Sequence, residues 1–239
     1  MSVALLGLAV LLGASVQRLA GIGFALVAAP VLVLLLGPGQ GVTLSNLAAG
    51  VISAVGLATT WRQVRPRTMV PLIAAAACTV PAGSWLAAKV PAPQLLLIIG
   101  GLVSAAVLLV IRGVRAPSLR GVGGAVAAGA TSGFMNSAAG VGGPAVSLYA
   151  VNTGWTAREF VPNAQLYGVV VNALSLTVKG LPHLAPPAWA VTAGALILGT
   201  AVGHVLAGRV EERQARRVVL GLALAGGLAT LTKGLAGLM

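Results

Sequence analysis

The chain has 239 residues, of which 58% are hydrophobic and 8% are charged, and its net charge at pH 7 is +12. Soluble domains carry about 25% charged residues, so this chain has too little polar surface to cover a soluble core. The mean hydropathy of +1.00 indicates an integral membrane protein and excludes a soluble one.

The basic residues lie in short stretches between apolar runs, which is typical of membrane topology signals. The sequence has no basic helix face and no aromatic platform, so we expect no nucleic-acid partner. The only cysteine, Cys78, excludes an internal disulfide and argues against a cysteine-ligated metal. We expect it to be a small buried residue.

Ten apolar segments follow one another along the chain, separated where glycine, proline and charge cluster. They cover residues 2–16, 22–36, 41–61, 68–88, 93–111, 119–134, 143–153, 158–178, 187–208 and 214–235. A helix needs about 20 apolar residues to cross a bilayer, and six of the ten segments reach that length. The other four form two pairs, so we predict that 2–36 and 119–153 are hairpins of short helices that enter and leave on one side.

The two halves of the chain repeat. Residues 83–90 align with 203–210 at a spacing of 120, with four of the eight pairs identical, and residues 20–23 align with 139–142 at a spacing of 119. We therefore predict an all-α polytopic membrane protein made of two half-repeats, 1–115 and 116–239. Each half is a re-entrant hairpin followed by three transmembrane helices, at 41–61, 68–88 and 93–111 and at 158–178, 187–208 and 214–235.

The distribution of Lys and Arg predicts the orientation, because cytoplasmic loops are enriched in both. With same-side hairpins, eleven basic residues fall in cytoplasmic loops and three fall outside. If each pair were one long crossing, the count would be eight against six. The eleven are Arg62, Arg65, Arg67, Arg112, Arg115, Arg120, Arg158, Arg209, Arg213, Arg216 and Arg217; Lys89, Lys179 and Lys233 lie outside. We predict inverted halves, with both termini outside the cytoplasmic membrane.

The hairpin tips are the candidate site, because inverted repeats with broken helices are the pattern of secondary transporters. Tip glycines let backbone N–H groups approach a ligand, and the helix after each tip directs its positive N-terminal end there. Two such ends from opposite leaflets would form an anion site near the midplane. The candidate substrate-binding residues in the tips are Gln17, Arg18, Gly21 and Gly23 in the first and Asn136, Ser137, Gly140, Gly142 and Gly143 in the second.

Further polar residues are predicted to flank the tips. Arg18 is the only charge in a predicted tip, and its guanidinium suits carboxylate, sulfonate or phosphate oxygens; the alternative is that it snorkels to the interface. In the helices that follow the hairpins, amides and hydroxyls can donate to substrate oxygens or hold a cation through their own oxygens, and the alternative for each of them is a helix–helix contact. These residues are Ser45, Asn46, Asn163, Gln165, Tyr167 and Asn172.

Several chemistries have no residues to support them. The three acids, Glu159, Glu211 and Glu212, all fall in predicted cytoplasmic loops, which argues against a carboxylate proton relay or an acidic cation pore. The chain has no G-x-x-x-x-G-K-[ST] and no H-E-x-x-H motif, and neither His183 nor His204 has a carboxylate partner within the bilayer. We expect no enzyme activity, no cofactor and no metal site.

The half-repeats and their glycine stretches resemble the sulfite exporter TauE/SafE family, also called the toluene sulfonate uptake permease family, over nearly the whole chain. The stretches are Gly21-Ile22-Gly23-Phe24 with the later Pro30, and Gly133-Phe134 with Gly140-Val141-Gly142-Gly143-Pro144. The resemblance implies transport of sulfur-containing anions such as sulfite, sulfoacetate or other sulfonates, and places family tip glycines at Gly21, Gly23, Gly140, Gly142 and Gly143. Phe24 and Ala25, and Asn136 and Ser137, depart from the family pattern and leave the substrate open.

The sequence thus predicts a secondary transporter of a small anion, with that anion and membrane lipid as partners and a homodimer left open. Three alternatives stay open: a passive anion channel through the same site, a membrane scaffold that transports nothing, and a membrane enzyme. Substrate, direction of transport and coupling ion are not predicted.

Overall fold

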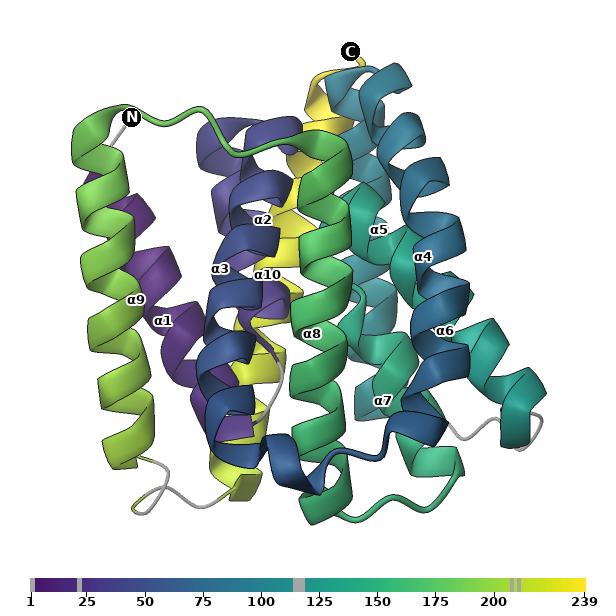
Figure 1. Ribbon diagram of the computed structural model, residues 1–239. Coiled ribbons are helices and arrows are strands. Elements are labelled where there is room, and N and C mark those ends of the chain that lie inside the picture. Colours follow the sequence, from purple (N-terminus) through teal and green to yellow (C-terminus); the bar gives the residue numbers. More distant parts are fainter. Residues whose placement is uncertain (1–2, 21–22, 114–118, 207–208, 210–211) are drawn as a thin grey trace.

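The computed structural model describes residues 3–20, 23–113, 119–206, 209 and 212–239, and over these residues the chain is all-α, without a strand (Figure 1). This confirms the predicted fold class. The helices are α1 (Val3–Ala20), α2 (Phe24–Leu36), α3 (Pro38–Thr60), α4 (Pro66–Lys89), α5 (Ala92–Ile111), α6 (Gly121–Ala139), α7 (Gly143–Asn152), α8 (Ala157–Lys179), α9 (Pro186–Leu206) and α10 (Glu212–Ala236), with a short 3₁₀ turn η1 (Trp61–Gln63).

Five helical stretches among the described residues are long and apolar enough to cross a membrane. They are Pro38–Gln63, Pro66–Lys89, Ala92–Ile111, Pro186–Leu206 and Arg217–Ala236. The sixth predicted crossing, α8, has the length, with 23 residues, but it is less apolar because it carries buried amides such as Asn163, Gln165 and Asn172. A polar helix can stand at membrane depth when other helices surround it, and α8 packs against α3 and α4.

The two hairpins turn back toward the ends from which they start. In Figure 1, α1 and α2 start and finish at the end of the molecule that holds both chain termini, whereas α6 and α7 start and finish at the opposite end. The hairpin limbs are unequal. With 18 and 19 residues, α1 and α6 are each about 27–29 Å long, whereas α2 and α7, with 13 and 10 residues, measure about 20 and 15 Å.

This inequality corrects the prediction of hairpins built from two short helices. The polar residues near each tip continue the first helix instead of breaking it, so α1 runs to Ala20 and α6 to Ala139. The short return helices have a consequence for the site. Because α3 measures about 35 Å over its 23 residues, α2 and α7 begin roughly halfway through the molecule.

The halves are packed across one another, since α1 lies along α9 and α6 lies along α4. Glycines allow both contacts. A Cβ on Gly83 of α4 would meet the Phe134 carbonyl and the Ser137 hydroxyl of α6, and one on Gly203 of α9 would meet the Ser15 carbonyl and Arg18 of α1. The two contacts are equivalent in the repeat: Gly83 and Gly203 are 120 residues apart, and their partners Phe134 and Ser137 follow Ser15 and Arg18 by 119 residues. The inverted relation of the halves remains a prediction, which the matched contacts favour.

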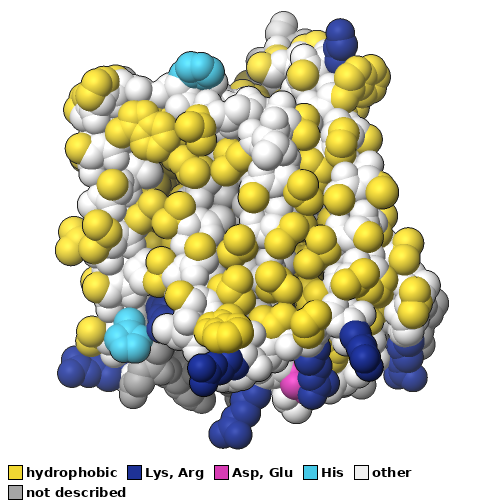
Figure 2. Space-filling view, in the orientation of Figure 1, with side chains coloured by type: hydrophobic (Ala, Val, Ile, Leu, Met, Phe, Trp, Pro, Cys, Tyr) yellow, Lys and Arg dark blue, Asp and Glu magenta, His cyan; other side chains and the backbone are white. Residues whose placement is uncertain are grey.

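The two ends of the molecule differ in charge. Figure 2 shows Lys and Arg side chains gathered mainly along the end opposite the two chain termini. We call it the basic end, and the other the terminal end. Exposed arginines of the basic end are Arg62, Arg65, Arg67, Arg112, Arg120 and Arg158. Between the two ends the surface in view is largely apolar (Figure 2). Cys78, in the middle of α4, is exposed, so its predicted burial is wrong.

Candidate functional site

The first hairpin brings a buried amide to α3. Gln17 lies in the last turns of α1 with 5% of its surface exposed, and its Nε2 donates hydrogen bonds to the Ser53 hydroxyl at 3.1 Å and to the Ala49 carbonyl at 3.5 Å. The return helix α2 then starts after Gly23, whose φ of 133° is a conformation that side chains rarely adopt. Gly23 therefore directs the chain from the end of α1 back into the middle of the molecule.

The second tip has its own glycine terminator. Gly140 adopts φ 74°, and its N–H donates to the Asn136 carbonyl at 2.8 Å, which ends α6 in a left-handed cap. The Ser132 hydroxyl then donates to the Gly142 carbonyl at 2.7 Å and holds the tip against α6. A Cβ on Gly142 would lie 2.7 Å from Ser132 and 2.8 Å from Asn136, so this position has no room for a side chain.

Asn136 joins the second tip to α8. Its Nδ2 donates to Asn172 Oδ1 at 3.1 Å and to the Ser175 hydroxyl at 3.2 Å, and Asn172 Nδ2 in turn donates to the Gly168 carbonyl at 2.8 Å. All three side chains are at least nine-tenths buried. Such a network fixes the position of the tip relative to α8 at the depth where α7 begins.

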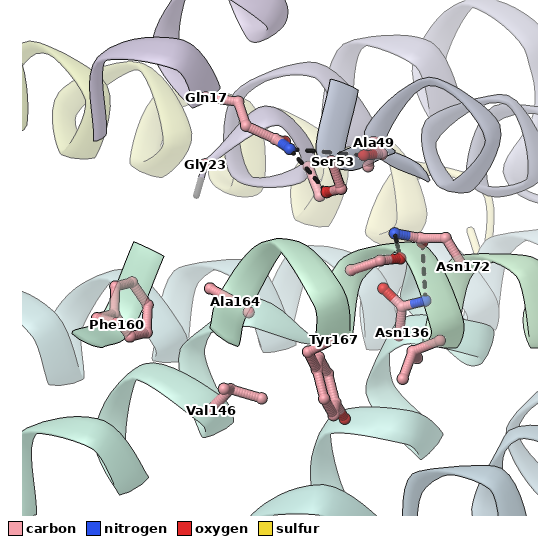
Figure 3. A pocket seen from close by; sticks show the side chains of 15 residues that line it. Gln17, Gly23, Ala49, Ser53, Asn136, Val146, Phe160, Ala164, Tyr167 and Asn172 are labelled. Carbon is pink, nitrogen blue, oxygen red and sulfur yellow. Dashed lines mark hydrogen bonds between the residues drawn. The ribbon is translucent and has the colours of Figure 1, made fainter. Parts of the chain in front are cut away.

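A pocket lies between the two tips and the helices α3 and α8, with Gln17 and Ser53 on one side and Asn136 and Tyr167 on the other (Figure 3). It holds about 560 Å³ of space, counting the part that is open to solvent. None of the described residues that line it is charged. They are Gln17, Gly23, Ala25, Ala49, Ser53, Asn136, Gly142, Gly143, Val146, Phe160, Ala164, Tyr167, Gly168, Val171 and Asn172.

The N-terminal ends of both return helices line this pocket. Gly23 and Ala25 belong to the start of α2, and Gly142 and Gly143 belong to the start of α7. The first N–H groups of a helix have no partner within it, and the helix dipole makes this end positive. Pro144 in the first turn of α7 costs no hydrogen bond, because its missing N–H would be unpaired there anyway. The pocket therefore offers positive potential without a charged side chain.

Seven of the predicted site residues come together at this pocket: Gln17, Gly23, Asn136, Gly142, Gly143, Tyr167 and Asn172. Tyr167 is one of the lining residues, and its hydroxyl donates to the Gly129 carbonyl at 3.5 Å. Gly21 is outside the described residues. Ser53, Ala49 and Gly168 line the pocket without having been predicted; for Ser53 the available signal is its place two helical turns after Ser45 on one face of α3.

Arg18 does not line the pocket. Its guanidinium lies 3.4 Å from His204 Nδ1, so it contacts the last turn of α9. This places the charge beside a neighbouring helix. The geometry does not support a direct contact between Arg18 and a ligand in the pocket.

The other predicted residues outside the pocket have separate surroundings. Asn163 holds the α3–α4 connection, because its Oδ1 accepts from the Arg65 N–H at 2.9 Å. Gln165 packs against Gly56 of α3. The Ser137 hydroxyl donates to the Gly133 carbonyl of its own helix at 3.0 Å. Gly140 lies against Ser45 and Asn46, one helical turn beyond Ala49 on α3.

The described helices thus define an all-α polytopic membrane protein with two opposed hairpins around a neutral, donor-rich pocket. A family model described as "Sulfite exporter TauE/SafE" matches residues 5–230. The chain belongs to the sulfite exporter TauE/SafE family, a family of membrane transporters. No curated protein and no solved structure matches the chain.

Proposed function

We propose that the chain is a secondary transporter that binds a small anion, a sulfur oxyanion or an organosulfonate, in the pocket between its two hairpin tips. The observation that carries the proposal is the pair of helix N-termini, those of α2 and α7, on the walls of one pocket whose described lining residues are all uncharged. Helix N-termini bind sulfate- and phosphate-like anions through backbone N–H groups. Membership of the TauE/SafE family supports sulfur oxyanions as the substrate class.

Neutral donors suit a transporter, because the site must release what it binds. A buried arginine or lysine would hold an anion by a charge-assisted hydrogen bond about twice as strong as a neutral one. Here the side-chain donors are the amides of Gln17, Asn136 and Asn172 and the hydroxyl of Ser53. These groups are hydrogen-bonded within the protein when no anion is present. An entering anion therefore replaces existing hydrogen bonds, and the empty pocket does not leave buried donors unpaired.

The pocket lies on the basic-end side of the second tip. Its lining on α8 extends from Asn172 to Phe160 in the first turn of that helix, and α8 begins at the basic end. We infer that a ligand enters this conformation from the basic end. The distribution of Arg supports a cytoplasmic basic end in the cell inner membrane, with both termini outside.

The test is flux in liposomes that contain the purified protein. Sulfite and sulfoacetate should enter with saturation, and unlabelled anion trapped inside should accelerate entry of labelled anion. Saturable flux without this counterflow would assign a passive channel instead, and a protein that moves no anion would be a scaffold. The matched variants are Gly143→Leu, which fills the start of α7, and Gly101→Leu, at a site on α5 with open space around it. Only the first should stop transport.

A further inference from the structure

Two neighbouring side chains on α3 are buried without a hydrogen-bond partner among the described residues. Ser45 is fully buried and Asn46 is 1% exposed. The hydroxyl of Ser45 and both amide atoms of Asn46 are unpaired. Because nearly all buried polar groups in proteins are hydrogen-bonded, adjacent unpaired groups require an explanation such as a bound solute, ordered water or another conformation. We call Ser45 and Asn46 the α3 pair.

The α3 pair continues the polar face of the pocket. Ser45, Ala49 and Ser53 follow at every fourth residue, so they lie on one face of α3, and the last two line the pocket. Beyond Ala49 the second tip covers this face. A Cβ on Gly140 would lie 3.6 Å from Asn46 Oδ1 and 3.6 Å from Ser45 Oγ. The pair is therefore one turn from the pocket and is closed off by the tip.

The second tip is fastened to α8 at the same level. Asn136 donates to Ser175, and the Lys179 ammonium donates to the carbonyl of Ser137. Both contacts lie on the terminal-end side of the pocket, because α8 runs from the basic end to the terminal end. If the tip left α8, the α3 pair, Ser175 and Lys179 would face a path that continues the pocket toward the terminal end.

We propose that the α3 pair is a second binding position for the transported anion, which the anion occupies when the second tip leaves α8. The inference rests on the proposed function. Ser45 offers one O–H donor and Asn46 offers two N–H donors, which suit the oxygens of an oxyanion. Lys179 of α8 brings positive charge to the last turn of α6, through its contact with the Ser137 carbonyl, and Gly140 directly after this turn lies beside the pair. A cation would use the oxygens of the pair but would leave the amide N–H groups unpaired.

The first test measures turnover and stability together. Asn46→Ala should lower the rate of sulfite transport about tenfold or more, the factor that corresponds to a loss of about 1.4 kcal/mol. The melting temperature should stay unchanged or rise, since neither side chain is hydrogen-bonded in this conformation. Ser104→Ala, which removes an equally unpaired hydroxyl from α5, is the control and should leave transport unchanged. Wild-type-like transport by Asn46→Ala would overturn the inference.

The second test follows access to the position. In a Cys78→Ser background, Asn46→Cys should react with a membrane-impermeant thiol reagent applied at the terminal-end side of the liposome. Sulfoacetate, which unlike sulfite does not react with thiol reagents, should slow the reaction about tenfold at about ten times its Kd, because occupancy protects the site. Protection by sodium but not by sulfoacetate would assign a cation site, and protection by neither would assign ordered water only. Each of these results would overturn the inference.

The two proposals fail in different ways. If the wild-type protein moves no sulfite and no sulfonate, the proposed function is wrong. If the wild type transports but Asn46→Ala does so equally well, the pocket remains the anion site and the second position is wrong.

Discussion

Asn136 is the residue through which the second tip meets both α8 and the pocket. Changing it to Asp keeps its size but adds a negative charge to a pocket in which every described lining residue is uncharged. A like charge close to a bound anion repels it in proportion to the inverse of distance and dielectric constant. We expect Asn136→Asp to weaken sulfite binding at least about tenfold, or about 1.4 kcal/mol, in a ligand-induced thermal-shift titration.

Asn163→Asp is the control for this charge, because it is the same substitution at another buried asparagine, on α8, outside the pocket. Its Oδ1 accepts from the Arg65 N–H, and Arg65 already pairs with Glu159 at 2.5 Å, so a carboxylate is tolerated there. Equal losses of affinity in both variants would contradict the assignment of the anion to the pocket.

Close packing around the tip glycine Gly142 predicts that a larger residue there lowers the stability of the protein. Gly142→Ala places a Cβ 2.7 Å from Ser132 and should cost about 1–3 kcal/mol, the usual penalty for overpacking. Gly194→Ala on α9 has nothing within 4 Å and should cost nothing, since Ala is the better helix former. Thermal unfolding in detergent measures both. A Gly142→Ala protein as stable as the wild type would show that the tip is less tightly packed than described.

The sequence could not predict which single residues line the pocket, because the direction in which each side chain points around its helix was unknown. Neighbours on a helix point about 100° apart, so Gln17 faces α3 while Arg18 faces α9. The sequence identified the polar stretch but could not say which member turns inward, because the first helix was expected to end at residue 16, whereas α1 continues to Ala20. The same uncertainty explains why Tyr167 lines the pocket while Gln165, two residues earlier on α8, packs against Gly56 of α3.

At the scale of elements, the packing of α1 along α9 can be tested by a disulfide. A Cβ on Gly7 would lie 2.7 Å from Val191 Cγ1, which is close enough for a cross-link between cysteines at these positions. In a Cys78→Ser background, Gly7→Cys with Val191→Cys should oxidise to one species that migrates faster on a denaturing gel. Leu8→Cys with Val191→Cys should not, because Leu8 is 52% exposed.

The sequence predicted the elements well because glycine and proline mark most of their ends. The hairpins were predicted from length, since neither 2–36 nor 119–153 fits one or two full crossings, and from the distribution of Lys and Arg. The relative length of their limbs could not be predicted. Gln17, Asn136 and Ser137 are polar without breaking a helix, so the first limbs continue to the glycine tips.

For the whole molecule, the orientation in the membrane is the main prediction. In a Cys78→Ser background, Arg67→Cys at the basic end should react with an impermeant thiol reagent only from the cytoplasmic side. Gln94→Cys, exposed at the start of α5 near the terminal end, should react only from outside. The expected sides follow from the clustering of Arg at one end. The opposite labelling pattern would invert the predicted topology.

The arrangement of the halves could be predicted only in part. Repeat spacing indicated two related units, but pairing between helices of different halves depends on side-chain fit that one sequence does not reveal. The close backbone contacts of Gly83 with α6 and of Gly203 with α9 became evident only in three dimensions. The volume of the pocket and its closure by the second tip likewise could not be predicted from the sequence.

The packing of α1 along α9 also constrains biogenesis. A ribosome delivers α1 to the membrane first, yet the helix that covers one of its sides is the ninth to be made. Until α9 is made, the first hairpin is in contact with lipid or an insertion factor, and Gln17 and Arg18 lack the neighbours that they have in the folded protein. An open reading frame split between α5 and α6 would therefore yield two fragments that need each other to mature.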